Sequence, residues 1–199
     1  MKRVLITAII IAYVVISCSV FQTAENFTRL KFRIHSANNY KLAGIQISNK
    51  KTAKDFSSVE LLKLTSSLLQ GKLPLTFNLN VEAKNPNEGS GGFGNTDLTI
   101  ESFPWRLFIE DRETVAGNIK APAYIPGKGE NVIIRLDVEF DVAKIIKDKN
   151  LDNVLGLVLK LGGVGSSTSN IKLMTKPVIG TPIGSIQYPD EITIVDKSF

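Results

Sequence analysis

The chain of 199 residues contains a single cysteine, Cys18, and a single histidine, His35. One cysteine cannot form a disulfide within the chain, and one cysteine with one histidine cannot supply the four ligands of a structural zinc site. With one residue of each kind, we also expect no Cys–His catalytic pair. The composition therefore argues against most recognisable enzymes, and we predict a protein without catalytic residues, cofactor or metal.

Charged residues are also modest in number, at 22%, and the net charge is only +5. Hydrophobic residues make up 43%, which suits a folded chain rather than a disordered one. A chain of this length buries a sufficient core without disulfides or metals, and a single folded domain is the simplest expectation.

Residues 1–17 have the pattern of a secretory signal peptide. Lys2 and Arg3 precede an apolar run over residues 4–16, which is shorter than the roughly 20 residues that cross a bilayer. The run ends in Val15-Ile16-Ser17-Cys18-Ser19, which resembles the lipobox of bacterial lipoproteins. That resemblance implies that Cys18 carries the lipid and becomes the mature N-terminus.

Two other interpretations of this segment remain open. Cys18 can be a free thiol, or residues 4–21 can stay uncleaved as a marginal transmembrane anchor. We favour lipid attachment, because the sole cysteine falls at the end of the apolar run. Ser19 stands where an aspartate would retain a lipoprotein in the inner membrane, so the sorting rules imply the periplasmic face of the outer membrane.

Loss of residues 1–17 also changes the charge. It removes Lys2 and Arg3 and no acidic residue, so the net charge falls from +5 to +3. This value is ordinary, and we expect no nucleic-acid partner. Residues 18–28 are polar and are predicted to be a tether, which leaves residues 29–199 as a single domain.

The domain is predicted to begin with a hairpin and one helix. Leu30, Phe32 and Ile34 alternate with polar residues as in a half-buried strand, Asn38-Asn39 suggests a turn, and a second strand is expected over 42–48. Residues 55–70 are predicted to form an amphipathic helix, capped by Asp55 or Ser57. Its apolar residues recur at spacings of three and four: Phe56, Val59, Leu61, Leu62, Leu64, Leu68 and Leu69.

The rest of the domain alternates with a period of two. Leu75, Phe77, Leu79 and Val81 are predicted to face inward on a strand that begins near Leu73. Further strands are predicted at 97–102, 105–111, 114–120, 131–142, 170–178 and 183–195, with a short helix at 143–149 and an ambiguous segment at 151–161. Many short strands with turns between them predict a mainly β fold, an antiparallel β-sandwich with one amphipathic helix.

The segment Leu-Pro-Leu-Thr-Phe-Asn-Leu-Asn-Val-Glu-Ala-Lys-Asn-Pro-Asn, residues 73–87, carries a family resemblance. It resembles the late-embryogenesis-abundant type 2 family, the water-stress and hypersensitive-response domain, which also occurs in bacteria and archaea. The similarity covers roughly residues 73–142 and is most specific at Asn85-Pro86-Asn87. It implies an immunoglobulin- or fibronectin-like sandwich with no known active site, and an association with stress tolerance that supplies no mechanism.

Two motifs resemble sites of known chemistry. Residues 89–94 match G-x-G-x-x-G, a motif that binds phosphate when a helix follows it. The residues that follow here alternate as in a strand, so we predict a loop without a phosphate site. Asp137, Glu139 and Asp141 share one strand face, which we interpret as solvated and paired with Arg135 and lysines rather than as a calcium site.

The remaining single residues have plain interpretations. His35 lies on the polar side of its strand and is expected to be exposed. Trp105 belongs to the core by its alternation, with a ligand-stacking platform as the alternative. Lys50, Lys51 and Lys54 are expected to form a solvated turn, with contact to anionic lipid as the alternative.

These observations predict a membrane-anchored lipoprotein whose β domain is a non-catalytic binding or structural module. It would present one sheet face, an edge strand or the loop over residues 88–95 to a protein partner. The alternative is a lipid or small-ligand carrier, and less so an enzyme, with a pocket between the helix 55–70 and the sheet. A large apolar pocket there favours the carrier, and a packed core favours the module.

Overall fold

The computed structural model describes residues 29–87, 89, 95–109, 111–146, 150–161, 171–181 and 184–195. The described chain is mainly β, with several antiparallel sheets and a few helices, which confirms the mainly β prediction. The signal peptide, Cys18 and the tether lie outside the described residues, as does the loop over 88–95 apart from its residues 89 and 95.

The first layer, which we call sheet A, is antiparallel with the strand order β2-β1-β3-β8. The long strands β1 (Lys31–Leu42), β3 (Pro74–Lys84) and β8 (Asn131–Asp141) run the length of the molecule, and β2 (Ile45–Gln46) pairs only with the end of β1. The alternation of β3 is confirmed, because its predicted inward residues are buried: Leu75, Phe77, Leu79 and Val81. The opposite face of β3 is polar.

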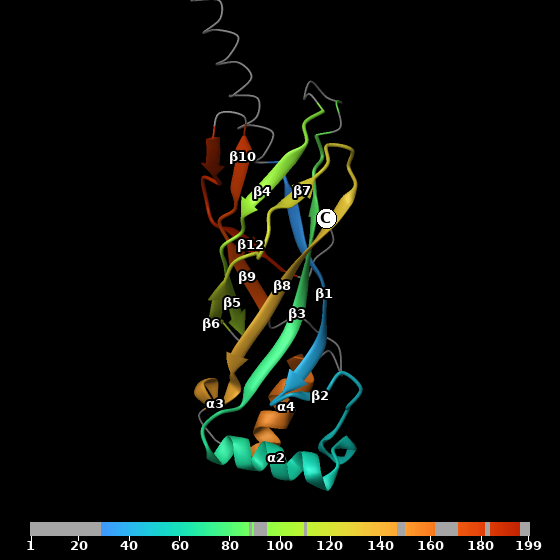
Figure 1. Ribbon diagram of the computed structural model, residues 1–199, viewed down its shortest axis with the longest axis vertical. Coiled ribbons are helices and arrows are strands. Elements are labelled where there is room, and N and C mark those ends of the chain that lie inside the picture. Colours follow the sequence, from blue (N-terminus) through green and yellow to red (C-terminus); the bar gives the residue numbers. More distant parts are fainter. Residues whose placement is uncertain are drawn as a thin grey trace, which may run out of the picture.

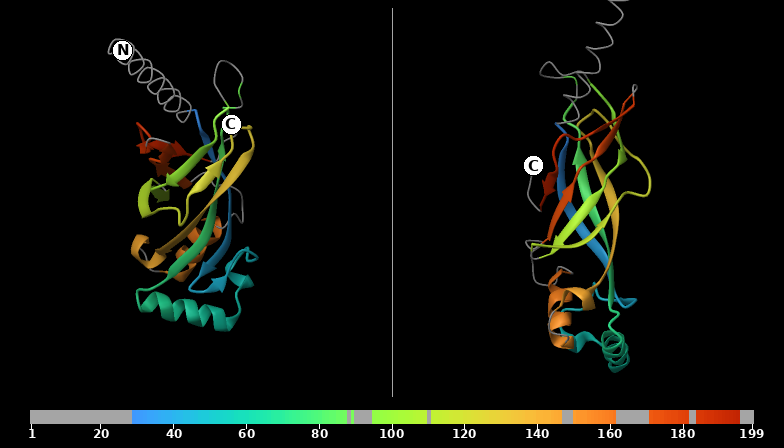
Figure 2. Two further views of the ribbon diagram at one scale, coloured as in Figure 1. Left: turned by 45° about the horizontal axis from the view of Figure 1, so that its top comes forward. Right: turned by 90° about the vertical axis from the view of Figure 1, so that its left-hand side faces the viewer.

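The second layer consists of two sheets with the orders β11-β10-β4-β7 and β12-β9-β5-β6, which lie across sheet A (Figures 1 and 2). The chain passes from one sheet to the other at Pro104 and again at Pro177, where proline lacks the N–H group that a continuous ladder needs. The strands are β4 (Leu98–Ser102), β5 (Trp105–Ile109), β6 (Arg112–Gly117), β7 (Ala123–Ile125), β9 (Ile171–Thr175), β10 (Val178–Thr181), β11 (Gly184–Gln187) and β12 (Ile192–Ile194).

The helices gather at one end of the molecule, which we call the helical end (Figure 1). They are η1 (Ala53–Asp55), α2 (Ser58–Leu69), α3 (Val142–Ile145) and α4 (Leu151–Leu161), so the ambiguous segment 151–161 is a helix. Helix α2 begins at Ser57, whose Oγ accepts from the Glu60 N–H at 3.2 Å while the Ser57 N–H donates to Glu60 Oε2 at 2.7 Å. This reciprocal cap explains why the helix starts there.

The opposite end, which we call the loop end, holds the turn after β3 and the turn between β7 and β8 (Figure 2). The described chain also enters the domain here, because Arg29 Nη1 donates to Asn87 Oδ1 at 3.0 Å. One continuous cluster of buried side chains connects the two layers and the helices. The molecule is therefore elongated, with helices at one end and the chain entry at the other.

The predicted turn at Asn38-Asn39 is wrong. Strand β1 continues through these residues with an irregularity in its register, and Asn39 takes a φ of 57°. Asparagine tolerates this left-handed conformation, so the strand absorbs it as a bulge rather than reversing. The chain turns instead at Ala43 and Gly44, with φ values of 48° and 80°, which shortens the predicted strand over 42–48 to β2.

Helix α2 is predicted correctly in position but not in which apolar residues it buries. Leu64 and Leu68 are buried, whereas Val59, Leu62 and Leu69 are 76%, 70% and 84% exposed. The apolar residues cover more than one side of the helix, and only the side toward the core has a partner. The sequence also predicts no strand at β7 and none over most of β10 (Val178–Thr181), and the predicted strand 183–195 is divided into β11 and β12.

Candidate functional site: a polar groove on sheet A

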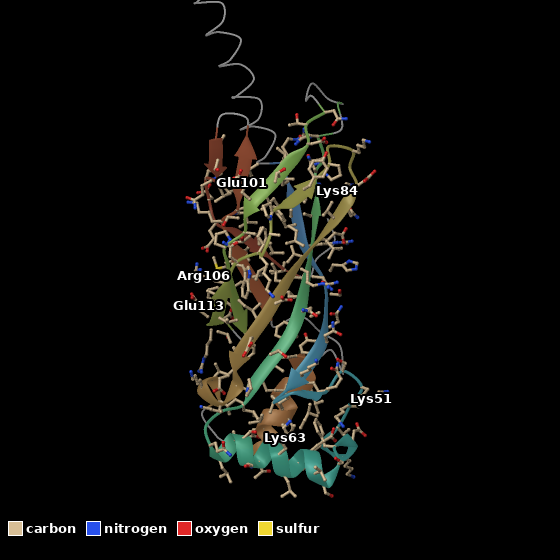
Figure 3. The ribbon with its side chains drawn as sticks, viewed as in Figure 1. Lys51, Lys63, Lys84, Glu101, Arg106 and Glu113 are labelled. Atoms are coloured by element: carbon tan, nitrogen blue, oxygen red, sulfur yellow. The ribbon has the colours of Figure 1, made fainter. Side chains whose placement is uncertain are left out.

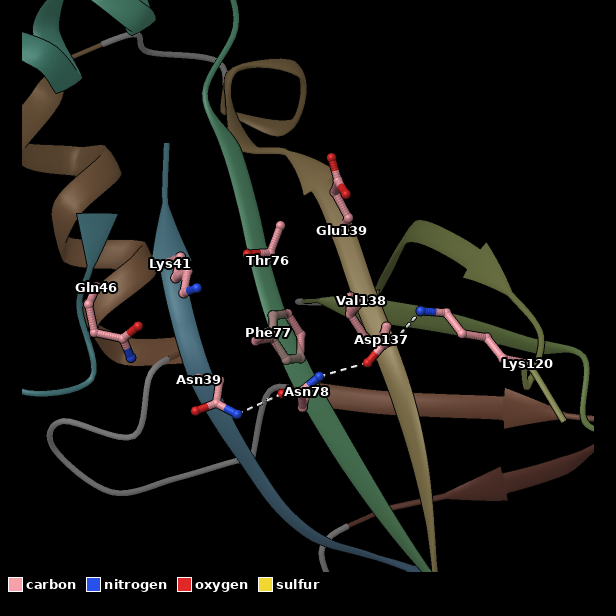
Figure 4. Close-up of a pocket in the computed structure, with 10 residues that line it drawn as sticks. All are labelled: Asn39, Lys41, Gln46, Thr76, Phe77, Asn78, Lys120, Asp137, Val138 and Glu139. Atoms are coloured by element: carbon pink, nitrogen blue, oxygen red, sulfur yellow. Dashed lines mark hydrogen bonds and ion pairs between the residues drawn. The ribbon is translucent and has the colours of Figure 1, made fainter. Parts of the chain in front are cut away.

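The outer face of sheet A carries a groove of about 760 Å³ near the helical end (Figure 4). Thr76 and Asn78 of β3 lie at its centre, between β1 on one side and β8 on the other. Asp137 of β8 lines its far side, and Lys120, which comes from the connection between β6 and β7, lies beyond β8. The groove exists because polar residues alternate with core residues on these long strands.

A line of hydrogen bonds crosses three strands within the groove (Figure 4). Asn39 Nδ2 donates to Asn78 Oδ1 at 2.7 Å, and Asn78 Nδ2 donates to Asp137 Oδ1 at 2.7 Å. The other oxygen of Asp137 pairs with the Lys120 ammonium group. Lys120 holds the pKa of Asp137 below its usual range, so this carboxylate stays ionised and acts as an acceptor.

The charges in the groove balance. Lys41 and Lys120 supply two positive charges, and Asp137 and Glu139 supply two negative ones, beside the side-chain amides of β1 and β3. Such a surface donates and accepts hydrogen bonds without a net attraction for either sign of charge. An ionised Asp137 is not a proton donor near neutral pH. The arrangement is therefore suited to binding a polar ligand rather than to acid catalysis.

A second polar cluster lies on the same face of β3, closer to the loop end. Glu82 is only 2% exposed, and its Oε2 accepts from Arg33 Nη2 at 2.7 Å and lies 3.0 Å from His35 Nδ1. Burial raises the pKa of Glu82, but the bonds from Arg33 and His35 outweigh burial and leave the pKa below its usual range. This cluster holds β1 to β3 through Glu82 Oε2, whereas Oε1 is buried without a hydrogen-bond partner in the part of the chain that the structure describes.

His35 itself is half exposed at 51%, as its place on the polar side of the strand predicts. Its bond to Glu82 is not predicted from the sequence. The signal was present, because both residues are polar members of alternating strands, but the register that brings them together is set by an irregularity in β1 between Ile34 and Ser36.

The Asn85-Pro86-Asn87 motif, which carries the family resemblance, is structural in this fold. Both asparagines are fully buried. Asn85 Nδ2 donates to the carbonyl oxygens of Thr96 at 2.8 Å and Ile125 at 3.3 Å, and its Oδ1 accepts from the Asn87 N–H at 3.1 Å. These bonds satisfy two backbone groups of the connection between β3 and β4 and the carbonyl at the end of β7, so the motif holds the loop end together.

Other candidate residues also have structural roles. Lys50 is only 9% exposed and donates to Glu60 Oε2 at 2.9 Å, which corrects its prediction as part of a solvated turn, whereas Lys51 and Lys54 are exposed. Asp141 accepts a hydrogen bond from the Leu73 N–H at 2.8 Å. It therefore connects the end of β8 to the start of β3 and is not part of the solvated face predicted for Asp137, Glu139 and Asp141.

Trp105 is 3% exposed, which confirms its prediction as a core residue. Within the described ranges, no three residues among histidine, cysteine, aspartate and glutamate lie close enough together to hold a metal ion. The predicted lipid site Cys18 falls outside these ranges. None of the described helices combines the length and the apolar composition that a membrane crossing requires.

Comparisons with known proteins add little to this picture. No family model and no curated protein matches the sequence. Among solved structures, the chain is similar to a protein from Archaeoglobus fulgidus, with 11% sequence identity and a TM-score of 0.31, over 62% of this chain and 88% of that protein. At this TM-score the similarity carries no argument about fold or function.

Proposed function

We propose that this protein is a lipoprotein, anchored at Cys18, whose domain is a non-catalytic binding module with its ligand site in the groove of sheet A. In this proposal the fold is an immunoglobulin-like sandwich of the late-embryogenesis-abundant type 2 kind, and the partner is a protein. The proposal depends on one observation: hydrogen bonds and an ion pair connect Asn39, Asn78, Asp137 and Lys120 in a line across an open groove.

The packing beneath α2 supports a binding module over a lipid carrier. Leu64 and Leu68 of α2 are 0% and 6% exposed, and Val154 and Val158 of α4 are 0% and 1% exposed. All four belong to the same core cluster, and α2 contacts α4 directly. Side chains therefore fill the space in which a carrier would hold its ligand.

The proposed anchor places the domain at the periplasmic face of the outer membrane. Several acyl chains on Cys18 would hold it firmly, because a single chain binds a membrane only reversibly. Since the described chain enters at the loop end, the groove and the helical end would face away from the anchoring membrane. This orientation suits presentation of a binding surface to a partner in the periplasm.

Metabolic labelling with a radioactive fatty acid tests the anchor. We expect the wild-type protein to carry label and to sediment with membranes, and Cys18→Ala to lose the label and to accumulate as precursor or in the soluble fraction. Ser19→Ala is the matched control and should behave as wild type. Equal labelling of Cys18→Ala and wild type would refute lipid attachment at this residue.

Site-specific photo-crosslinking in cells tests the groove. A photoreactive residue at position 120 should give a discrete set of adducts, and one at position 31, which is exposed at the loop end, should not give the same set. Adducts at position 120 should be lost when Asn78→Ala removes the centre of the groove. Identical adducts from both positions would contradict a ligand site in the groove.

A further inference from the structure

The strongest feature outside the groove is an exposed apolar stripe on α2. Val59, Leu62 and Leu69 are 76%, 70% and 84% exposed, and their spacings of three and seven place them on one side of the helix. The opposite side holds Leu64 and Leu68, which are buried in the core. Helix α2 lies across the helical end (Figures 1 and 2). Because its buried side packs on the core, the stripe faces outward along the long axis of the molecule.

The positive charge of the chain is concentrated around this stripe. Residues 50–72 contain five lysines and two acidic residues, so they carry a net charge of +3, which equals the net charge of residues 18–199 as a whole. Lys51, Lys54, Lys63 and Lys72 are exposed, and Figure 3 shows Lys63 on α2 and Lys51 beside the segment that leads into it. Glu60 is already paired with Lys50 at 2.9 Å.

We propose that α2 is a membrane-contact surface that lies flat on an anionic bilayer. Val59, Leu62 and Leu69 enter the region between the headgroups, and the exposed lysines contact lipid phosphates. A surface helix with apolar side chains on its outer side and lysines at its edges is suited to this position. The flat end of an elongated molecule meets a planar surface along the whole stripe.

A second copy of the chain is a poorer occupant. A stable protein interface buries about 1,200–2,000 Å² in total, and the stripe offers only three aliphatic side chains. Two copies meeting here would also bring two regions of net charge +3 together. An anionic bilayer can bury the apolar stripe and also attract the positive charge around it, so we assign it as the binding partner of this surface.

The bilayer in question is an apposed one, an assignment that rests on the proposed anchor at Cys18. The eleven Cα–Cα steps from Cys18 to Arg29 span at most about 40 Å when fully extended. The eleven residues of β3 rise about 36 Å between the two ends of the domain, and α2 lies beyond the end of β3 at Pro74. When the loop end stands on the membrane that holds the lipid, the helical end therefore lies at least the length of β3 away from that membrane and points toward an apposed one.

A vesicle-bridging experiment tests this inference. The purified lipoprotein is reconstituted in neutral phosphatidylcholine vesicles, and flotation shows whether it is anchored. Fluorescent vesicles that contain phosphatidylglycerol are then added, and their recruitment is measured by co-sedimentation. We expect recruitment of these anionic vesicles, no recruitment of fluorescent phosphatidylcholine vesicles, and loss of recruitment at high salt.

Variants of exposed residues localise the effect without disturbing the core. Leu62→Ser with Leu69→Ser should lower recruitment about tenfold or more, since each leucine loses its burial. Ile133→Ser, at a residue that is 46% exposed on sheet A, should leave recruitment unchanged. Lys51→Glu with Lys54→Glu should lower recruitment, whereas Lys31→Glu at the loop end should not.

The outcomes separate this inference from the anchor. Protein that fails to float refutes the anchor alone, and the bridging assay is then repeated with the chain held on neutral vesicles through a C-terminal polyhistidine tag and a nickel-chelating lipid. In either format, equal recruitment of neutral vesicles, or full recruitment by the Leu62 and Leu69 variant, overturns the membrane contact. Self-association in sedimentation that disappears in that variant overturns it in favour of a second copy.

Discussion

The two ends of β3 differ in which side chains are buried and which are exposed. At the loop end, the polar side chains of Glu82, Asn85 and Asn87 are buried and bonded to the protein. At the helical end, Asn78 lines an open groove, and leucines of the adjacent α2 are exposed. The comparison teaches that the loop end uses its polar groups for architecture, whereas the helical end leaves both kinds of surface free to bind.

Asn85→Ala is expected to have the largest effect, because it removes the centre of the loop end. It leaves the carbonyl groups of Thr96 and Ile125 and the N–H of Asn87 without their buried partner. We expect the free energy of unfolding to fall by about 3 kcal/mol. Urea denaturation measures this loss, and a change no larger than that of an exposed asparagine would show that the motif is not structural.

Glu82→Gln is expected to have the next largest effect. The amide is similar in size to the carboxylate but cannot pair with the charge of Arg33, which donates to Glu82 Oε2 through two nitrogen atoms. Because Arg33 is 31% exposed and can turn partly to solvent, we expect a loss of about 2 kcal/mol in the free energy of unfolding. An unchanged denaturation midpoint would contradict the structural role of this cluster.

The same variant tests the pH dependence. Since the pKa of Glu82 is lowered in the folded state, its contribution to stability is complete above the ordinary glutamate pKa of about 4.3 and is lost as the pH falls through the lower folded value. We expect wild-type stability to decrease below about pH 4 more steeply than that of Glu82→Gln. Parallel curves for the two proteins would assign the acid sensitivity to other carboxyl groups.

Asn78→Ala is expected to have the smallest effect on stability. In this variant Asn39 and Asp137 exchange their bonds with Asn78 for bonds with water in an open groove, so the free energy of unfolding should change by no more than about 0.5 kcal/mol. Thermal denaturation measures this change. A loss as large as that of Asn85→Ala would erase the distinction between the two ends and make the groove another structural cluster.

Periodicity predicted the strands well where one face is buried. The alternation of Leu75, Phe77 and Leu79 identifies β3 from the sequence because each of these residues reaches the core. The same pattern fails for α2, because Leu62 is as apolar as Leu64, and only the position of the sheets decides which of them is covered.

The candidate site was only partly predictable. The sequence places Asp137 on a polar strand face, but the line from Asn39 through Asn78 to Lys120 depends on strands that are far apart in the chain. Their register is fixed by long-range pairing and by the bulge at Asn39, where the sequence predicts a turn. Residues that meet across a sheet cannot be identified from local pattern alone.

The pairing of β1 with β3 determines how the domain bears mechanical force. β1 is the first strand after the chain enters at the loop end, and it pairs antiparallel with β3 from Lys31 to Leu42. A pull between the N-terminal attachment and the helical end is directed along both strands. Such a pull loads the hydrogen bonds between β1 and β3 in shear, so they bear the force together instead of breaking one after another.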